Sequence, residues 1–154
     1  MDSDDFLKTV YEQKTKQQFT VRQIYEKLGE QDFRRLEAES IHQLLHQDQE
    51  NKIIALGGGA LSNPFLTESD LQALGFICCL DIPDPVAYER ILKQGLPPFL
   101  QQEADPFRAF CEQNRNRREI FQKHAHIMLK PADFETTPRD MALHILSVYK
   151  ETVL

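Results

Sequence analysis

The sequence predicts an α/β fold in which parallel strands are covered on both faces by helices. Three short apolar runs lack the alternation of a half-exposed strand and therefore suit the buried strands of a parallel sheet. The segments between them carry capping residues and helical periodicity. A length of 154 residues is about one domain, so we expect a single domain over residues 1–154.

The apolar runs give the expected strands. They are Ile53–Leu56, Phe76–Leu80 and the weaker His126–Leu129.

The expected helices alternate with these strands. Thr20, Thr67 and Pro85 stand where a helix can begin, as N-cap or first-turn residues. The ranges are Thr20–Leu28, Gln31–His46, Thr67–Gly75, Pro85–Lys93, Pro106–Lys123 and Pro138–Lys150.

Composition excludes several classes of partner. Twenty-four acidic residues against 18 basic ones give a net charge of −6, which opposes nucleic-acid binding. The longest nearly apolar run, Leu74–Leu80, is far shorter than a membrane span. Three cysteines, two of them adjacent at Cys78 and Cys79, suit a reducing compartment. We expect a cytoplasmic protein that binds neither nucleic acid nor a membrane.

Two charged residues fall on the apolar face of the helix predicted over residues 31–46. A projection at 100° per residue places Arg34 and Glu37 there, one turn apart, whereas Arg35 points the opposite way. Burying an unpaired charge is costly, so Arg34 and Glu37 should pair with each other or hold an anionic ligand. A purely structural ion pair is the alternative.

The same helix carries a possible metal site. His42 and His46 have the i, i+4 spacing of two ligands, with Glu39 nearby. They project onto the polar face and lack a third ligand in sequence reach. We therefore interpret them as surface histidines and expect no metal site there.

Two further features suit an anionic or sugar-like ligand. Gly57, Gly58 and Gly59 follow an expected strand, where glycine lets backbone approach a ligand; a bare tight turn is the alternative. This run lacks the Gly-Lys-Ser/Thr ending of a phosphate-binding loop, and no G-x-G-x-x-G motif occurs. Three arginines lie close together in the helix that begins at Pro106: Arg115, Arg117 and Arg118. They can bind a carboxylate or a phosphate, and a solvated basic patch is the alternative.

Several motifs, in order along nearly the whole chain, together resemble the shikimate kinase family. The family's D-T-D element is similar to Asp2-Ser3-Asp4, and its F-R-x-x-E segment is similar to residues 33–37. Its strand ending in a glycine triplet resembles residues 54–60. Its R-x-x-x-Y-x-x-x-A pattern is similar to Arg117, Phe121 and Ala125.

This resemblance implies a three-layer α/β/α fold of the P-loop kinase type with strand order 2-3-1-4-5. The family's first, central strand and its GxxxxGK[ST] loop have no counterpart in this chain. We expect that the natural protein starts upstream of Met1 or that this chain is a truncated product. The family's mobile lid corresponds to about residues 94–106, and Leu96 replaces an arginine of that lid.

The resemblance also implies a function and a set of site residues. The activity is ATP:shikimate 3-phosphotransferase, in the biosynthesis of chorismate and aromatic amino acids. Asp4 would orient or deprotonate the attacking hydroxyl, and Asp2 would lie near Mg²⁺. Shikimate would be held by Arg34 and Arg117 and by the triplet Gly57, Gly58 and Gly59. Arg90 is a weak candidate for a contact with ATP.

Loss of the phosphate loop is expected to impair binding of ATP and Mg²⁺ by this chain. Two other functions stay open. One is an inactive module that binds shikimate or has a regulatory role, and the other is a kinase for a related small polyol. We expect a monomer whose partner is the small molecule shikimate.

Overall fold

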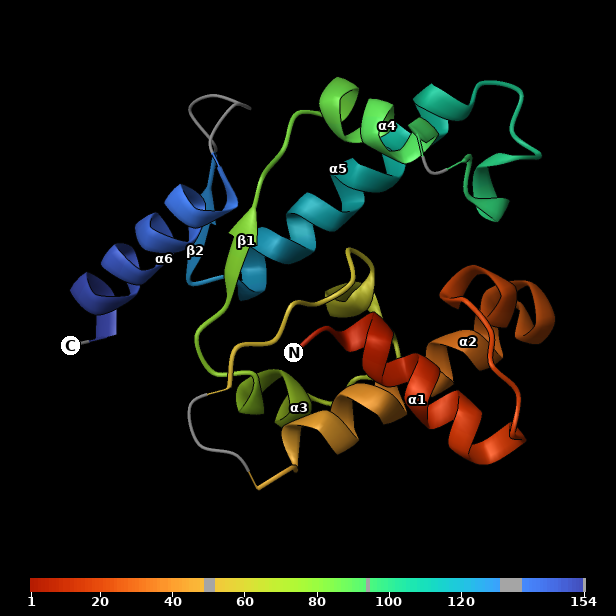
Figure 1. The fold of residues 1–154 in the computed structure, drawn as a ribbon. Coiled ribbons are helices and arrows are strands. Elements are labelled where there is room, and N and C mark those ends of the chain that lie inside the picture. The colour runs from red at the N-terminus through yellow and green to blue at the C-terminus, as the bar shows by residue number, and fades with distance from the viewer. Residues whose placement is uncertain (49–51, 94, 131–136, 154) are drawn as a thin grey trace. The chain divides into compact units, whose positions relative to one another are not determined.

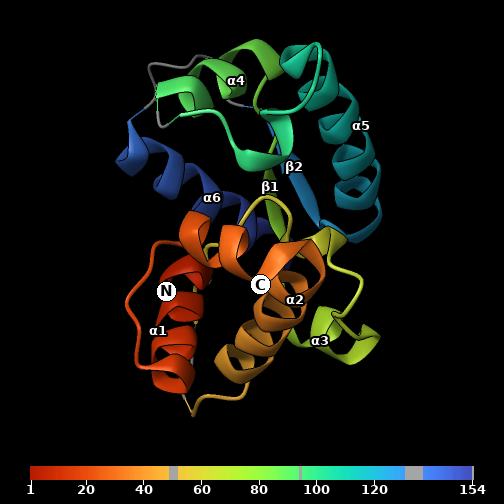
Figure 2. The same ribbon diagram turned by 90° about the vertical axis from the view of Figure 1, so that its right-hand side faces the viewer.

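The computed structural model describes residues 1–48, 52–93, 95–130 and 137–153. Six α-helices, two short 3₁₀ helices and two strands occur in these ranges (Figures 1 and 2). The helices are α1 Ser3–Thr15, α2 Val21–Leu45, α3 Glu68–Ala73, α4 Asp84–Lys93, α5 Pro106–His124 and α6 Pro138–Val153. The 3₁₀ helices are η1 Ala60–Ser62 and η2 Pro98–Leu100, and the strands are β1 Cys78–Leu80 and β2 Ile127–Leu129.

The chain divides into two compact units. The first unit comprises Met1–Gly75 and Leu96–Pro106, and the second comprises Phe76–Gly95 and Phe107–Leu154. The single domain over residues 1–154 stays a prediction.

Helix α1 opens the first unit and is the one α-helix that the sequence analysis did not predict. The Asp2 carboxylate caps it by accepting hydrogen bonds from the amides of Asp4 and Asp5. Leu7, Val10 and Tyr11 are buried at the i, i+3, i+4 spacing of an amphipathic helix. This helix fixes the place of Asp4, which lies in its first turn.

Helix α2 packs along α1 (Figure 1) and contains the two helices predicted over residues 20–28 and 31–46. Thr20 caps it through a reciprocal pair of hydrogen bonds with Gln23. Gly29 interrupts it, with a φ of 75° and a ψ of 171° that favour glycine. The predicted boundary between the two helices is therefore confirmed as a break at Gly29.

The core of the first unit lies between α1 and α2. It consists of Leu7, Val10, Tyr11, Ile24, Phe33 and Leu36. The ammonium group of Lys52 closes the end of α2 by donating to the carbonyls of Leu44, Leu45 and Gln47. The chain then returns toward the start of α1.

The first of the three apolar runs does not form the buried strand that the sequence predicts. Residues 53–56 hold a single parallel bridge, between Asp2 and Ala55. Ile53 is 77% exposed. Local apolarity does not reveal whether a strand will be covered, because coverage depends on distant parts of the chain.

The second unit is built around the parallel pair β1 and β2, with Cys78, Cys79 and Leu80 opposite Ile127, Met128 and Leu129. Both strands lie within the predicted runs and are shorter than predicted. Figures 1 and 2 show the pair between α5 and α6. Tyr88 of α4 packs against Phe107 and Phe110 of α5. The helices predicted from Pro85, Pro106 and Pro138 are all confirmed.

The predicted lid, about residues 94–106, contains η2, which belongs to the first unit. Gln94 lies outside the described residues. The carbonyl of Leu96 accepts hydrogen bonds from the Arg22 guanidinium and from the Gln101 amide. Leu100 is 1% exposed.

No helix in the described ranges combines the length and the apolarity that crossing a membrane requires.

Candidate functional site

The start of α1 and the glycine triplet are brought together by backbone hydrogen bonds. The Ser3 amide donates to the Ala55 carbonyl over 2.9 Å, and the Ala55 amide donates to the Met1 carbonyl over 2.8 Å. The Gly57 amide then donates to the Ser3 hydroxyl over 3.1 Å. These bonds set Asp4 beside Gly57, where a Cβ added to the glycine would lie 3.1 Å from Oδ1 of Asp4.

Arg34 and Glu37 form the ion pair that the helical projection predicts. Nη1 of Arg34 lies 2.8 Å from Oε2 of Glu37, and the two side chains are 19% and 9% exposed. Arg35 is exposed, as predicted, and lies over the ring of Phe65. The prediction that buried charge on this face must find a partner is therefore confirmed.

The Arg34 guanidinium lies directly against Gly59. A Cβ at Gly59 would stand 2.7 Å from Nη1 and 3.1 Å from Nη2, so a larger residue would displace the arginine. Nη1 also lies 3.5 Å from the Gly59 carbonyl. Within the described part of the chain, Nε and Nη2 of Arg34 have no hydrogen-bond partner. This half of the guanidinium is free to bind an anion.

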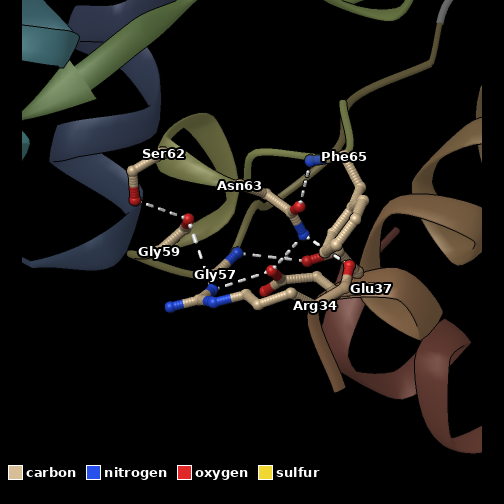
Figure 3. A network of polar contacts seen from close by, with 8 residues as sticks. Arg34, Glu37, Gly57, Gly59, Ser62, Asn63 and Phe65 are labelled. Carbon is tan, nitrogen blue, oxygen red and sulfur yellow. Dashed lines mark hydrogen bonds and ion pairs between the residues drawn. The ribbon is translucent and has the colours of Figure 1, made fainter. Parts of the chain in front are cut away.

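Asn63 connects the glycine loop to this ion pair (Figure 3). Its amide nitrogen donates to Oε2 of Glu37 and to the Arg34 carbonyl, each over 2.8 Å. Its amide oxygen accepts from the Phe65 amide over 2.9 Å. Asn63 is 5% exposed, so the loop and α2 are joined by a buried polar contact.

Asp4 has the electrostatics of a proton acceptor. Burial raises its pKa, and the neighbouring carboxylates of Asp2, Glu37 and Asp5 raise it further. A carboxylate held at a raised pKa accepts a proton more readily than a solvated one. Asp4, Arg34 and the triplet thus place a base, a cation and open backbone near one another.

The surroundings of Asp2 do not form a magnesium site by themselves. Its Oδ1 is engaged in capping α1, at 2.8 Å from the Asp4 amide. Across the described residues, no three His, Cys, Asp or Glu side chains gather closely enough to hold a metal ion. The role of Asp2 near Mg²⁺ stays a prediction, and no chemical step is derived through the metal.

The two histidines of α2 lie on the surface, as the sequence predicts. Nδ1 of His42 is 2.7 Å from Oδ1 of Asp70, and the His42 ring stacks against that of His46. The Asp70 carboxylate also accepts from Thr67 in the capping box of α3. The contact between His42 and Asp70 joins α2 to α3.

The remaining predicted site residues belong to the second unit. Arg117 is partly buried on α5, and Arg90 is exposed on α4. Arg118, the neighbour of Arg117, is bound to Asp81, to Asp84 and to the Ile82 carbonyl. Arg34 belongs to the first unit and Arg117 to the second, and their joint action stays a prediction.

Two residues of the arrangement were not predicted as part of a site. Ser3 had only its place between two acidic residues as a signal, and Asn63 had only its place after a glycine-rich run. Asparagine in such a position is typical of a turn, which Asn63 also forms. Neither signal could reveal the contact across to α2.

The chain is similar to known proteins of one family. The sequence model of one family, described as "Shikimate kinase", matches residues 1–150. A relative named shikimate kinase from Xylella fastidiosa (strain M12) is 33% identical over 110 residues, which are 71% of this chain and 59% of the relative. Another, from Aquifex aeolicus (strain VF5), is 32% identical over 82% of this chain and 70% of the relative.

Solved structures show the same fold. "Shikimate kinase from Acinetobacter baumannii in complex with shikimate" aligns with a TM-score of 0.77 at 24% identity, covering 99% of this chain and 79% of that one. A shikimate kinase from Bacteroides thetaiotaomicron aligns with a TM-score of 0.69 at 21% identity, over 100% and 83%. The predicted α/β fold of the P-loop kinase type is confirmed.

The chain spans about 59% of the length of the first curated relatives that it matches. Because the family model matches residues 1–150, the chain belongs to the shikimate kinase family.

Proposed function

We propose that the first unit forms the substrate side of a shikimate kinase site, in which the 3-hydroxyl of shikimate is phosphorylated at the expense of ATP. The observation that carries this proposal is the half-free guanidinium of Arg34 beside Gly59. A planar carboxylate matches the free Nε and Nη2 pair, because two parallel N–H bonds form there. Family membership favours shikimate as the source of that carboxylate.

Asp4 acts on the hydroxyl end of the same molecule. Its carboxylate accepts a hydrogen bond from the attacking hydroxyl and takes the proton as the oxygen bonds to the γ-phosphorus of ATP and ADP leaves. Its raised pKa suits this role. The glycines at 57, 58 and 59 leave room for the ring, since a Cβ at Gly57 or Gly59 would enter the space beside Asp4 or Arg34.

ATP and Mg²⁺ require a nucleotide-binding site in addition to the shikimate site. The sequence of residues 1–154 contains no GxxxxGK[ST] loop to cradle phosphates. The proposed function therefore assigns shikimate binding to the described residues, and phosphoryl transfer to a protein that also carries such a loop. Arg117, Arg90 and Asp2 keep the roles that the family resemblance implies, as proposals.

Shikimate binding to the full chain, measured by calorimetry, tests the proposal. Arg34→Ala should lower the affinity by about 2–3 kcal/mol, because a charge-assisted contact is lost. Arg35→Ala is the matched control, one residue along the same helix and exposed, and should leave the affinity unchanged. Equal affinities of the two variants would show that Arg34 does not hold the substrate.

A turnover assay separates the alternatives. Shikimate binding without turnover of ATP by this chain is what an inactive shikimate-binding module also predicts, so turnover is measured in a chain to which a phosphate loop has been restored. Phosphorylation of shikimate there supports the kinase, and preference for another small polyol would replace shikimate as substrate. The monomeric state, the cytoplasmic location and the absence of nucleic-acid partners stay predictions.

A further inference from the structure

The Arg34–Glu37 pair is held from outside α2 by one buried side chain, that of Asn63. Glu37 is 7% exposed, and its Oε2 receives both Nη1 of Arg34 and the amide nitrogen of Asn63, each over 2.8 Å. A carboxylate oxygen with two donors in fixed directions has little freedom to rotate. The direction in which Glu37 presents Oε2 to Arg34 is therefore set in part by Asn63.

Asn63 is in turn fixed at three points. Its amide nitrogen also binds the Arg34 carbonyl, its amide oxygen accepts from the Phe65 amide, and its own backbone amide donates to the Ala60 carbonyl over 2.9 Å. The loop that ends in Asn63 begins at the glycine triplet, against which the guanidinium lies. The Asn63 side chain therefore connects the loop after the glycine triplet to Glu37 and Arg34 on α2 (Figure 3).

We propose that Asn63 is a positioning residue for substrate binding: it orients Glu37 so that Arg34 keeps Nε and Nη2 turned to the substrate carboxylate. This inference rests on the proposed function. It differs from a structural role of Asn63, which would need only the turn bond to the Phe65 amide.

Asn63→Asp separates the two roles. The introduced carboxylate keeps the size of the side chain and can still accept from the Phe65 amide, so a turn alone would survive. The two donated bonds are lost, and a second negative charge faces Glu37, with Arg34 on α2 and Asp4 on α1 as the other charged groups nearby. Shikimate affinity at about pH 8 should fall at least about tenfold, because Glu37 is pushed away from Arg34.

The pH dependence gives a readout that a structural role would not produce. When two carboxylates are in contact, their mutual repulsion raises the pKa of one of them, and the proton that it takes up on acidification restores a donor between them. The loss of affinity in Asn63→Asp should therefore be smaller at about pH 5.5 than at about pH 8. The parent chain should show no such recovery.

Asn114 provides the matched control. It also donates from its amide nitrogen to a carboxylate that an arginine holds, at 3.1 Å from Oδ1 of Asp84, which pairs with Arg118. Asn114→Asp therefore introduces the same chemical change in the second unit. It should lower thermal stability and leave shikimate affinity as in the parent.

Asn63→Ser keeps the experiment decisive should Asn63→Asp fail to fold. The serine hydroxyl can still accept from the Phe65 amide but is too short to reach Glu37. It should weaken shikimate binding about as much as Asn63→Asp does at about pH 8, with no recovery at lower pH.

All variants are compared by calorimetry with shikimate on the full chain, with thermal unfolding as the check of folding. Parent-like affinity of Asn63→Ser, or of Asn63→Asp at both pH values, would overturn the inference. A parent chain that does not bind shikimate would refute the proposed function itself, before any Asn63 variant is considered.

Discussion

The two units each contain an arginine, a carboxylate and an asparagine in contact, and the two clusters differ in how far the arginine is satisfied. In the second unit, Arg118 donates to Asp81 over 2.8 Å, pairs with Asp84 at 2.7 Å and donates to the Ile82 carbonyl over 3.0 Å. In the first unit, the contacts of the Arg34 guanidinium with other described residues are to one carboxylate and one carbonyl, both through Nη1.

Under the proposed function, this difference separates an arginine that stabilises the fold from one that binds the substrate. The two carboxylates raise the pKa of Arg118 above its usual value, and Arg118 in turn, with Asn114, lowers the pKa of Asp84. The Nε and Nη2 donors of Arg118, which are the pair that a planar carboxylate would use, are both engaged. A guanidinium with two free donors beside a glycine can receive a planar anion.

The largest expected effect on stability comes from Arg118→Met. It leaves two carboxylates without their common partner, and the free energy of unfolding should fall by about 2–3 kcal/mol in urea titrations at neutral pH. Arg34→Met strands a single carboxylate and should cost less. Lys93→Met, which breaks an exposed pair with Glu89, should change the free energy by less than about 0.5 kcal/mol. Equal losses for Arg34 and Arg118 would remove the distinction between the two clusters.

The next effect concerns binding and comes from Gly59→Ala. The added methyl group would meet the guanidinium at 2.7 Å, and the end of a long side chain yields more easily than backbone. Arg34 should therefore turn away, which lowers shikimate affinity about tenfold with little loss of stability. Calorimetry and thermal unfolding measure the two quantities. A large loss of stability without loss of binding would show that the arginine does not move.

A smaller effect is expected at Asp70, whose carboxylate is hydrogen-bonded to Thr67 and His42. Hydrogen bonds from Thr67 and His42 lower its pKa from 3.8 to about 2. Because the folded-state pKa is depressed, this stabilisation is complete above the unfolded-state pKa and is lost as the pH falls through about 2. Asp70→Asn should lower the free energy of unfolding by about 1–2 kcal/mol at neutral pH. The difference from the parent should shrink in urea titrations below pH 4; a constant difference would contradict it.

The smallest effect has the opposite sign and concerns Asp4→Asn. The folded-state pKa of Asp4 is raised, so its ionisation opposes folding as the pH rises through that pKa. Removing the charge should leave Tm unchanged or raise it by about 1–3 °C at neutral pH, while transfer of the hydroxyl proton is lost. Asp5→Asn, at an exposed residue paired with Lys8, should bring no rise. A clear fall in Tm for Asp4→Asn would show that the carboxylate supports the fold.

The features that the sequence predicts well are those coded within a few residues. Thr20 and Thr67 begin their helices as predicted, and the ion pair of Arg34 with Glu37 is one of the two arrangements that helical spacing predicts. Helix α1 was missed although Leu7, Val10 and Tyr11 carry the necessary spacing. The signal for this helix is therefore local and present in the sequence.

The features that were missed depend on residues far apart in the chain. The partners of Arg118 are more than 30 residues away, and Asn63 reaches back to Glu37 across 26 positions. The exposure of Ile53 likewise depends on what lies beside it and not on its own apolarity. Local patterns fix the helices, and long-range contacts decide which charges remain open.

The path of the chain through the two units has a consequence for cooperativity. Leu96–Pro106 belongs to the first unit but is joined at both ends to segments of the second. Excision at Gly75 would leave the first unit without Leu100 and without the Leu96 carbonyl that binds Arg22. Neither unit is a continuous stretch of sequence. When the second unit unfolds, both ends of Leu96–Pro106 are therefore released from folded structure. Unfolding of the two should therefore be coupled through covalent connectivity alone.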